Sequence, residues 1–209
     1  TFTATDGHRL AIAEYKLEEA LKESNLTISA KTLEEVIKLC KSQGEEEIIE
    51  TSYDERQISF RTKDQEINSR LINGQYPACQ KLIPTSYKRK FEVSRKELQN
   101  ALELVEVFAD KSYLARFNLQ NKDNPTLKIS SQEQELGNAE QELIIQNLEG
   151  KDIMVGLNTR YVLDVIKNIE NANFKFLMNE NNQPVQLAPT ETNENEKLTC
   201  IVMPVTLKE

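Results

Sequence analysis

The sequence has few of the residues that build metal sites. Its 209 residues contain one histidine, His8, and three cysteines, Cys40, Cys79 and Cys200, with no Cys-x-x-Cys pair. An odd number of widely spaced cysteines argues for reduced thiols in a cytoplasm and against a Cys/His metal site. We therefore expect no metal and no cofactor. Cys40 and Cys200 have apolar neighbours, so we expect both to be small core residues.

Long apolar runs are also missing. No stretch approaches the roughly 18 apolar residues that a membrane-spanning helix needs, and no signal-peptide pattern opens the sequence. With 38% hydrophobic and 29% charged residues, the composition predicts packed soluble domains. We expect a cytoplasmic protein of two domains of about 100 residues each. The formal net charge of −8 disfavours nonspecific nucleic-acid binding over the whole surface, but it leaves room for a local basic face.

Recognisable catalytic patterns are scarce as well. A hydrolase needs a nucleophile beside a base or a pair of carboxylates, yet His8 has no Cys or Ser motif nearby, and no Gly-rich phosphate loop occurs. We therefore expect a protein that is not an enzyme. His8 and Arg9 follow the pair Asp6-Gly7, which favours a tight turn between two strands with Gly7 at positive φ. From these residues alone, a plain structural turn and a binding site both remain open.

Three helices are predicted from their caps and apolar stripes. Thr32 with Glu35 and Ser94 with Glu97 form capping boxes, and Asn158 is a candidate N-cap. The stripes are Leu33, Val36, Ile37 and Cys40; Leu98, Leu102, Val105 and Phe108; and Val162, Val165, Ile166 and Ile169. Propensity favours one more helix between residues 15 and 25. Apolar runs predict strands at 26–28, 48–49, 58–60, 67–72, 115–119, 126–129, 142–145, 152–156, 174–178, 185–187 and 198–207.

The two halves of the chain match at a constant offset of 129 positions. Residues 32–38 align with 161–167, Ile48 with Leu177, and Ile72 with Ile201. A helix and three strands in one register predict a duplicated domain, of α+β class, with two helices against two antiparallel sheets in a complete copy. Prolines 77 and 84 bracket the boundary. We expect an incomplete domain at 1–83 and a complete one at 84–209, and hence a fragment of a longer protein.

Three stretches together resemble one known family. Residues 5–11 (Thr-Asp-Gly-His-Arg-Leu-Ala), 73–77 (Asn-Gly-Gln-Tyr-Pro) and 201–207 (Ile-Val-Met-Pro-Val-Thr-Leu) are similar in order and spacing to the bacterial DNA sliding clamp, the beta subunit of DNA polymerase III. The resemblance covers the latter part of the middle domain and the whole C-terminal domain. It implies repeated sliding-clamp modules, with helices on one face and antiparallel sheets on the other.

The resemblance also implies a function. In this family a homodimer of full-length subunits closes a ring around duplex DNA and acts as a non-catalytic processivity factor in DNA replication, without reading sequence. A peptide-binding groove on each subunit holds the replicative polymerase, the clamp loader and repair proteins through a short linear motif. The residues that match this groove are Thr5, Gly7, His8, Arg9, Leu10, Pro77, Lys81, Leu82, Asn158, Tyr161, Val202, Met203, Pro204 and Val205.

Other surfaces follow from the same resemblance. Lys31, Lys81 and Arg95 are candidates to face DNA, and Val107, Phe108, Glu140 and Glu142 match the dimer interface. The sequence departs from the family at Thr206, where an arginine is usual, and at Ala78 and Cys79, where an aspartate and an aromatic residue are common. An alternative is a stand-alone adaptor that binds peptides without encircling DNA.

Overall fold

The computed structural model describes residues 1–18, 23–42, 48–109, 111–131 and 137–207. They form two compact units, one of Thr1–Glu18 with Cys79–Glu209 and one of Glu19–Ala78. The N-terminal hairpin therefore belongs to the unit that the second half of the chain builds. Our division into domains at residues 83 and 84 stays a prediction.

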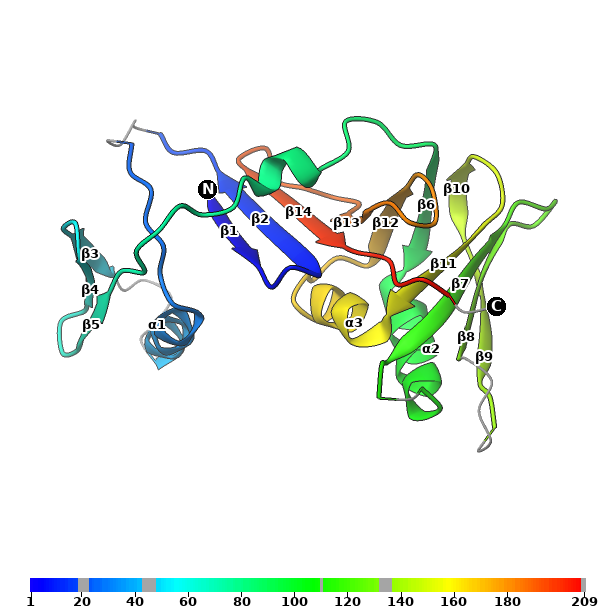
Figure 1. Ribbon diagram of the computed structural model, residues 1–209, viewed down its shortest axis with the longest axis horizontal. Coiled ribbons are helices and arrows are strands. Elements are labelled where there is room, and N and C mark those ends of the chain that lie inside the picture. The colour runs from blue at the N-terminus through cyan, green and yellow to red at the C-terminus, as the bar shows by residue number, and fades with distance from the viewer. Residues whose placement is uncertain (19–22, 43–47, 110, 132–136, 208–209) are drawn as a thin grey trace. The chain divides into compact units, whose positions relative to one another are not determined.

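A seven-stranded antiparallel sheet forms one layer of the larger unit. Its order is β1-β2-β14-β13-β12-β6-β10, so that the N-terminal hairpin lies beside the last strand of the chain (Figure 1). The hairpin confirms the predicted strand–turn–strand at the start of the sequence. The strands are β1 Phe2–Thr5, β2 Arg9–Tyr15, β6 Arg89–Ser94, β10 Gln146–Glu149, β12 Asn173–Met178, β13 Val185–Pro189 and β14 Glu196–Val202.

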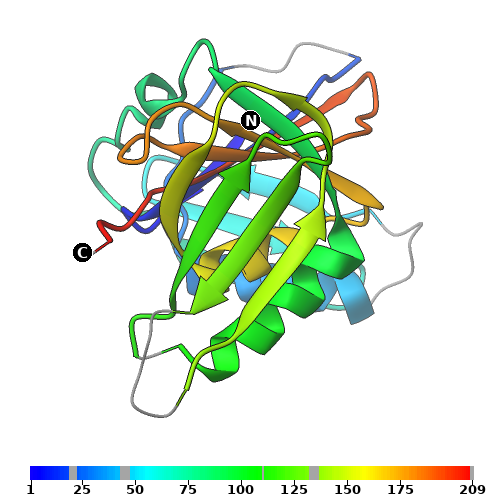
Figure 2. The same cartoon turned by 90° about the vertical axis from the view of Figure 1, so that its right-hand side faces the viewer.

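A second antiparallel sheet and two helices complete this unit. The sheet has the order β11-β7-β8-β9. Helix α2 packs on β8 and β9 (Figure 2), and helix α3 packs on α2, β11 and β14. Two helices against two antiparallel sheets confirm the predicted α+β class. The elements are β7 Leu114–Gln120, β8 Thr126–Ser131, β9 Glu140–Ile144, β11 Ile153–Asn158, α2 Arg95–Val107 and α3 Thr159–Lys167.

The N-cap residues of α2 and α3 are those that the sequence predicts. The Ser94 hydroxyl accepts a hydrogen bond from the backbone N–H of Glu97 at 3.4 Å. The Asn158 side chain accepts hydrogen bonds from the N–H groups of Arg160 and Tyr161 at 3.0 and 3.3 Å. Both helices bury their apolar stripes in one core between the sheets. This core fixes the position of α3, which carries several candidate site residues.

The smaller unit packs one helix against a three-stranded sheet. Helix α1 (Ala30–Ser42) contacts β5 (Glu66–Arg70), which pairs with β4 (Gln57–Arg61), and β4 pairs with β3 (Glu50–Tyr53). The same order recurs in the larger unit, where α3 precedes β12, β13 and β14. The offset of 129 places β4 on β13 and β5 on β14, in agreement with the predicted duplication.

The start of α1 corrects one predicted cap. Thr32 was the predicted N-cap, but the hydroxyl that accepts a hydrogen bond from the first turn is that of Ser29. The donor is the backbone N–H of Thr32, at 3.1 Å. The helix therefore begins before Thr32, which is buried with Leu39, one heptad further on. Cys40 lies one residue past this face and is exposed, and so is Ile37. The prediction that both belong to the buried stripe is wrong.

Several strand predictions also need correction. Residues 26–28 form no strand, and the strand expected at 48–49 begins at Glu50. Strands β6 and β10 were not predicted, and β14 ends at Val202, where Met203 leaves the sheet. Of the helix expected between 15 and 25, residues 19–22 lie outside the described residues, and the described residues on either side are not helical.

Candidate functional site

The β1–β2 turn has a conformation fixed by its own side chains. The Asp6 carboxylate accepts hydrogen bonds from the N–H groups of His8 and Arg9, both at 3.0 Å. The Thr5 hydroxyl donates to the Arg9 carbonyl at 2.7 Å and accepts from the N–H of Gly7 at 3.1 Å. Gly7 has φ of +88°, as the Asp-Gly pair predicts, and only glycine adopts this conformation without strain. The turn therefore holds the exposed His8 in a defined position.

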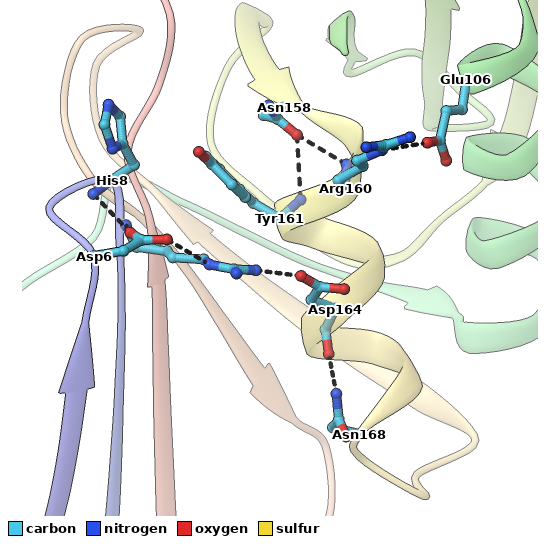
Figure 3. A network of polar contacts seen from close by, with 9 residues as sticks. Asp6, His8, Glu106, Asn158, Arg160, Tyr161, Asp164 and Asn168 are labelled. Atoms are coloured by element: carbon cyan, nitrogen blue, oxygen red, sulfur yellow. Dashed lines mark hydrogen bonds and ion pairs between the residues drawn. The ribbon is translucent and has the colours of Figure 1, made fainter. Parts of the chain in front are cut away.

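Arg9 connects this turn to α3 through two carboxylates, those of Asp6 and Asp164, which are labelled in Figure 3. Its guanidinium forms an ion pair with Asp6 at 2.9 Å and a second one with Asp164. It also lies 4.8 Å from the centre of the Tyr161 ring, within the range of a cation–π contact. The hydrogen bond to Asp164 raises the pKa of Arg9, and the opposing effect of burial is smaller. The two elements that carry His8 and Tyr161 are thereby fixed to each other, with the ring centroids 6.2 Å apart.

Asp6 is held in its charged form by the same contacts. Partial burial by itself raises the pKa of this carboxyl group. The hydrogen bonds from the N–H of His8 and from Arg9 outweigh burial, so that the pKa lies below its usual value. A charged Asp6 keeps Arg9 oriented toward α3.

A second set of contacts fixes the N-terminus of α3. Arg160 forms an ion pair with Glu106 of α2 at 2.7 Å and stacks over the ring of Tyr113, 3.4 Å from its centre. The Asn158 amide donates to the Ser112 carbonyl at 3.0 Å. Figure 3 shows Asn158 and Tyr161 on the side of α3 that faces the β1–β2 turn.

The C-terminal segment passes between the turn and β11. The N–H of Met203 donates to the His8 carbonyl at 2.8 Å, and the N–H of Val205 donates to the Gly156 carbonyl at 2.9 Å. Gly156 permits this approach, because a Cβ there would lie 2.5 Å from the carbonyl oxygen of Val205. Met203 and Pro204 are consequently held, half-buried, next to His8.

Beside the turn lies a small apolar cluster, separate from the main core, which we call the apolar floor. Leu10 and Ile201 are register partners on β2 and β14, and both are almost fully buried. The remaining members of the apolar floor are Ile12, Cys79, Ile83 and Met203. A cavity of about 380 Å³ continues from Ile12 and Ile83 along the same strands. An apolar surface bordered by fixed polar groups suits an extended apolar peptide segment.

The candidate groove residues divide into four groups. Thr5, Gly7, His8, Arg9, Leu10, Asn158, Tyr161, Met203, Pro204 and Val205 are joined by the contacts above or follow one another on the same segments. Lys81 and Leu82 are exposed on the short 3-10 helix Cys79–Leu82. Val202 is fully buried in the main core, so it supports β14 from inside. Pro77 belongs to the smaller unit.

Several members of the site were not predicted. Ile12 shares a face with Leu10, and strand alternation from Leu10 was the signal that could have found it. Ile201 is the register partner of Leu10, which only the pairing of β14 with β2 reveals. Cys79 and Ile83 flank the predicted Lys81 and Leu82. Asp164 carries no sequence signal for its role, because its ion pair with Arg9 depends on how α3 packs.

The other predicted surfaces have mixed environments. Lys31 and Lys81 are exposed, whereas the Arg95 guanidinium donates to the Ile166 carbonyl at 2.8 Å. Val107 is 75% exposed at the end of α2, and Phe108 is half-buried against the core. Glu140 and Glu142 lie exposed on β9, the edge strand of its sheet, where Glu140 pairs with Lys128 at 2.6 Å.

The described residues give little sign of other chemistry. Among them, no helix is long and apolar enough to cross a membrane, and no cluster of His, Cys, Asp and Glu side chains is placed to hold a metal ion.

The three cysteines differ in burial. Cys79 and Cys200 are buried, and Cys40 is exposed. Burial raises the pKa of the Cys200 thiol to about 11. The core position predicted for Cys200 is confirmed.

Comparison with known proteins gives matches over almost the whole chain. The family model for the C-terminal domain of the DNA polymerase III beta subunit matches residues 80–206, and the model for its central domain matches residues 1–78. Proteins named beta sliding clamp from Synechocystis and Synechococcus elongatus are 34% and 31% identical to the chain, and each match covers 99% of it. Each match covers 55% of the relative, so the chain spans about half the length of these proteins.

A solved structure agrees with these matches. The crystal structure of the DNA polymerase III beta subunit from Thermotoga maritima superposes with a TM-score of 0.86 at 30% identity, covering 99% of this chain and 54% of that one. The predicted resemblance and the predicted arrangement of the fold are both confirmed.

Proposed function

This chain belongs to the family of DNA polymerase III beta subunits, the beta sliding clamps, and we propose that it forms part of a ring that encircles duplex DNA during replication. Residues 1–83 are the back part of the middle domain in this proposal, and residues 84–209 are the C-terminal domain. The protein itself catalyses no reaction. It is a processivity factor, because a polymerase tethered to a closed ring cannot diffuse away from the template.

The observation that carries this proposal is the apolar floor beside a rigid turn. Leu10, Ile12 and Ile201 are the buried base of the apolar floor, and its partly exposed members, Ile83 and Met203, present apolar surface to a ligand. The β1–β2 turn and Tyr161 make one wall beside it. Arg9 fixes that wall in advance through Asp6, Asp164 and Tyr161. Binding a peptide there orders few protein groups, which reduces the entropic cost of association.

The partners of this groove are proteins that carry a short apolar motif. We assign to it the replicative DNA polymerase, the clamp loader and repair proteins. Their apolar side chains would cover the apolar floor, and the polar groups of His8, Asn158 and Tyr161 would accept or donate hydrogen bonds at its border. Removal of apolar surface from water supplies the main driving force for this contact.

A homodimer of the full-length protein closes the ring. β9 is an edge strand of its sheet as the structure describes it, and a strand edge can pair with a strand of another chain. Val107 and Ile144 are large apolar side chains that are 75% and 73% exposed, so a partner subunit could cover both. Phe108, Glu140 and Glu142 complete the proposed interface.

DNA would contact this ring through phosphates. Lys31, Lys81 and Arg95 are the residues we assign to it. Several other basic side chains on the helices have acidic partners, such as Lys167 with Glu103 and Lys38 with Glu35. Few phosphate contacts predict weak, salt-dependent binding without base specificity, which suits a ring that must slide.

The second candidate is an adaptor that binds the same peptides without encircling DNA. It shares the groove and differs in the dimer interface. Loading of the full-length protein on circular DNA distinguishes the two, because a closed ring stays bound until the circle is cut, whereas an adaptor does not.

Titration with a fluorescent peptide tests the groove. We expect the pentapeptide Gln-Leu-Ser-Leu-Phe to bind saturably to this chain, and a variant with Met203→Ala and Pro204→Ala to lose most of that binding. Met154→Ala, at an exposed position on β11, is the control and should bind normally. Absence of saturable binding by the folded chain, or equal binding by the double variant, would contradict the assignment.

A further inference from the structure

We propose that the groove continues beyond its apolar floor into a polar subsite, which receives a neutral, hydrogen-bonding side chain of the docked peptide. The polar subsite consists of Glu14, Gln186, Lys197 and Thr199, which line the cavity of about 380 Å³. The inference rests on the proposed peptide-binding function, which it deepens by naming a specificity determinant.

Strand pairing places the polar subsite in line with the apolar floor. Leu10 pairs with Ile201, Ile12 with Thr199, and Glu14 with Lys197. Residues two apart on a strand share a face, so these three pairs form one row along β2 and β14. The row changes from apolar at Leu10 and Ile201 to charged at Glu14 and Lys197. A peptide lying along it passes from the apolar floor to the polar subsite.

Thr199 is the hydroxyl-bearing residue of the polar subsite. It lines the cavity, and the residue as a whole is 4% exposed. A ligand above it would exclude water from the cavity, so an apolar ligand would leave the hydroxyl facing apolar atoms, at a cost in free energy. A polar ligand atom that forms a hydrogen bond with the hydroxyl would avoid this cost.

Gln186 adds a donor to the subsite. The Tyr87 hydroxyl donates to the amide oxygen of Gln186. The N–H₂ group of the same amide can therefore donate a hydrogen bond to a ligand. Thr199 can both donate and accept. A side chain that offers an acceptor together with a donor, such as the amide of Asn, matches this pair.

The charges at the far end favour a neutral ligand. Glu14 and Lys197 form an ion pair at 3.3 Å, which leaves the subsite without net charge. Burying a charged side chain in a neutral, half-enclosed site costs desolvation that no unpaired charge offsets. An amide avoids this cost, so we expect Asn to be preferred over both Asp and Leu.

The spacing of the row sets the position of this side chain in the peptide. Thr199 precedes Ile201 by two residues, a separation of about 7 Å along the strand. An extended peptide spans the same distance with two residues. The amide should therefore lie two positions from an apolar anchor, on whichever side of the motif points toward Thr199.

Paired peptides test the inference. Gln-Leu-Ser-Leu-Phe-Gly-Asn and Asn-Gln-Leu-Ser-Leu-Phe are each compared with twins that have Leu or Asp in place of Asn, by fluorescence titration against this chain. We expect one of the two Asn peptides to bind about five- to tenfold more tightly than its Leu twin. The same Asn peptide should also bind more tightly than its Asp twin.

Variants identify the groups responsible. Thr199→Val, which keeps the shape of the side chain, should abolish the preference for Asn and leave binding of the unextended pentapeptide unchanged. Gln186→Met should reduce the same preference, and it replaces Thr199→Val in the test if that variant does not fold. Thr190→Val, in the loop after β13, is the matched control and should keep the preference for Asn.

The outcomes separate the two proposals. If the pentapeptide binds but neither Asn peptide exceeds its twins, or if the preference survives both variants, the polar subsite is wrong and the groove stands. Tighter binding of an Asp peptide would overturn the neutral character of the ligand. If the folded chain does not bind the pentapeptide at all, the groove and the subsite both fail.

Discussion

The guanidinium of Arg9 donates to the carboxylate of Asp164, although the two residues are 155 positions apart in the sequence. The first belongs to the hairpin that opens the chain, and the second lies in the middle of α3. This ion pair joins two of the segments that make the proposed groove. Its strength therefore affects the shape of the groove more than the stability of the fold.

The Arg9–Asp164 pair should contribute little to stability and more to binding. Both side chains are partly exposed, and exposed pairs contribute about 0.2–1 kcal/mol. A double-mutant cycle with Arg9→Ala and Asp164→Ala, measured by urea unfolding, should give a coupling free energy in that range. Peptide affinity should fall severalfold in each single variant, because the turn loses its contact with α3. A coupling energy of several kcal/mol would mean that the pair supports the core.

Asp6 should make the stability of the turn depend on pH. Its pKa is lower in the folded protein than in the unfolded chain, so its stabilising effect is complete above the unfolded value and is lost as the pH falls through the folded value. Asp6→Asn keeps an acceptor for the backbone N–H groups but removes the charge near Arg9. We expect its unfolding free energy to be lower than that of the parent chain at pH 6, and the difference to shrink below about pH 4.

The pH series needs a matched control. Glu55→Gln, at an exposed position between β3 and β4, should show no comparable narrowing of the difference. A constant difference for Asp6→Asn from pH 6 to pH 3 would mean that the charge of Asp6 does not stabilise the turn.

Local signals in the sequence were sufficient for much of the fold. The Asp6-Gly7 turn and the caps at Ser94 and Asn158 depend on side chains within a few residues of the backbone they bond, so the sequence contains the whole interaction. The predicted cap of α1 was wrong because Thr32 has Glu35 three residues further on and fits the capping-box pattern, whereas Ser29 has Thr32 there and does not. In the structure Thr32 is buried, its hydroxyl bonds that of Ser69 on β5, and Ser29 accepts the hydrogen bond of the cap. Cys40 was misplaced because the packing of α1 on β5 selects the face of Thr32 and Leu39 as the buried one.

Long-range packing accounts for what could not be predicted. Val202 and Ile201 are both apolar neighbours, and only the pairing of β14 with β2 reveals that Ile201 faces the apolar floor while Val202 faces the main core. The role of Asp164 depends on where α3 packs. The environment of the Thr199 hydroxyl has no signal in the sequence, because it is defined by neighbours from other strands.

The three cysteines should differ sharply in reactivity. Cys40 is exposed, Cys79 is buried, and burial raises the pKa of Cys200 to about 11, so that little thiolate forms near neutral pH. We expect a thiol reagent such as DTNB to modify one cysteine quickly in the native protein and all three in denaturant. Cys40→Ser should remove the fast phase. A fast phase that survives this change would mean that Cys79 or Cys200 is accessible.

Val107 should be important for dimerisation but not for folding. Its side chain is 75% exposed, so Val107→Glu should leave the unfolding free energy of this chain within about 0.5 kcal/mol of the original. In the full-length protein the same change should weaken the homodimer, because it places a charge in the proposed interface. Asn100→Glu, exposed on the same helix, is the control. Sedimentation analysis showing an unchanged dimer for Val107→Glu would remove Val107 from the interface.

Gly156 should be intolerant of even one added methyl group. In a strand, replacing glycine with alanine normally stabilises, since the unfolded chain loses freedom. Here the new Cβ would lie 2.5 Å from the Val205 carbonyl oxygen and 2.8 Å from the Leu207 side chain. The C-terminal segment must then move away from β11, and the hydrogen bond from Val205 to Gly156 is lost.

Gly156→Ala should therefore lower the unfolding free energy by about 1–3 kcal/mol, as overpacking does elsewhere. It should also weaken binding of the pentapeptide, because Met203 and Pro204 lie on the displaced segment. Met154→Ala, exposed on the same strand, should change stability by no more than about 0.5 kcal/mol. If Gly156→Ala were neutral or stabilising, the segment after Val202 would be free to shift, and the groove could not depend on its close contact with β11.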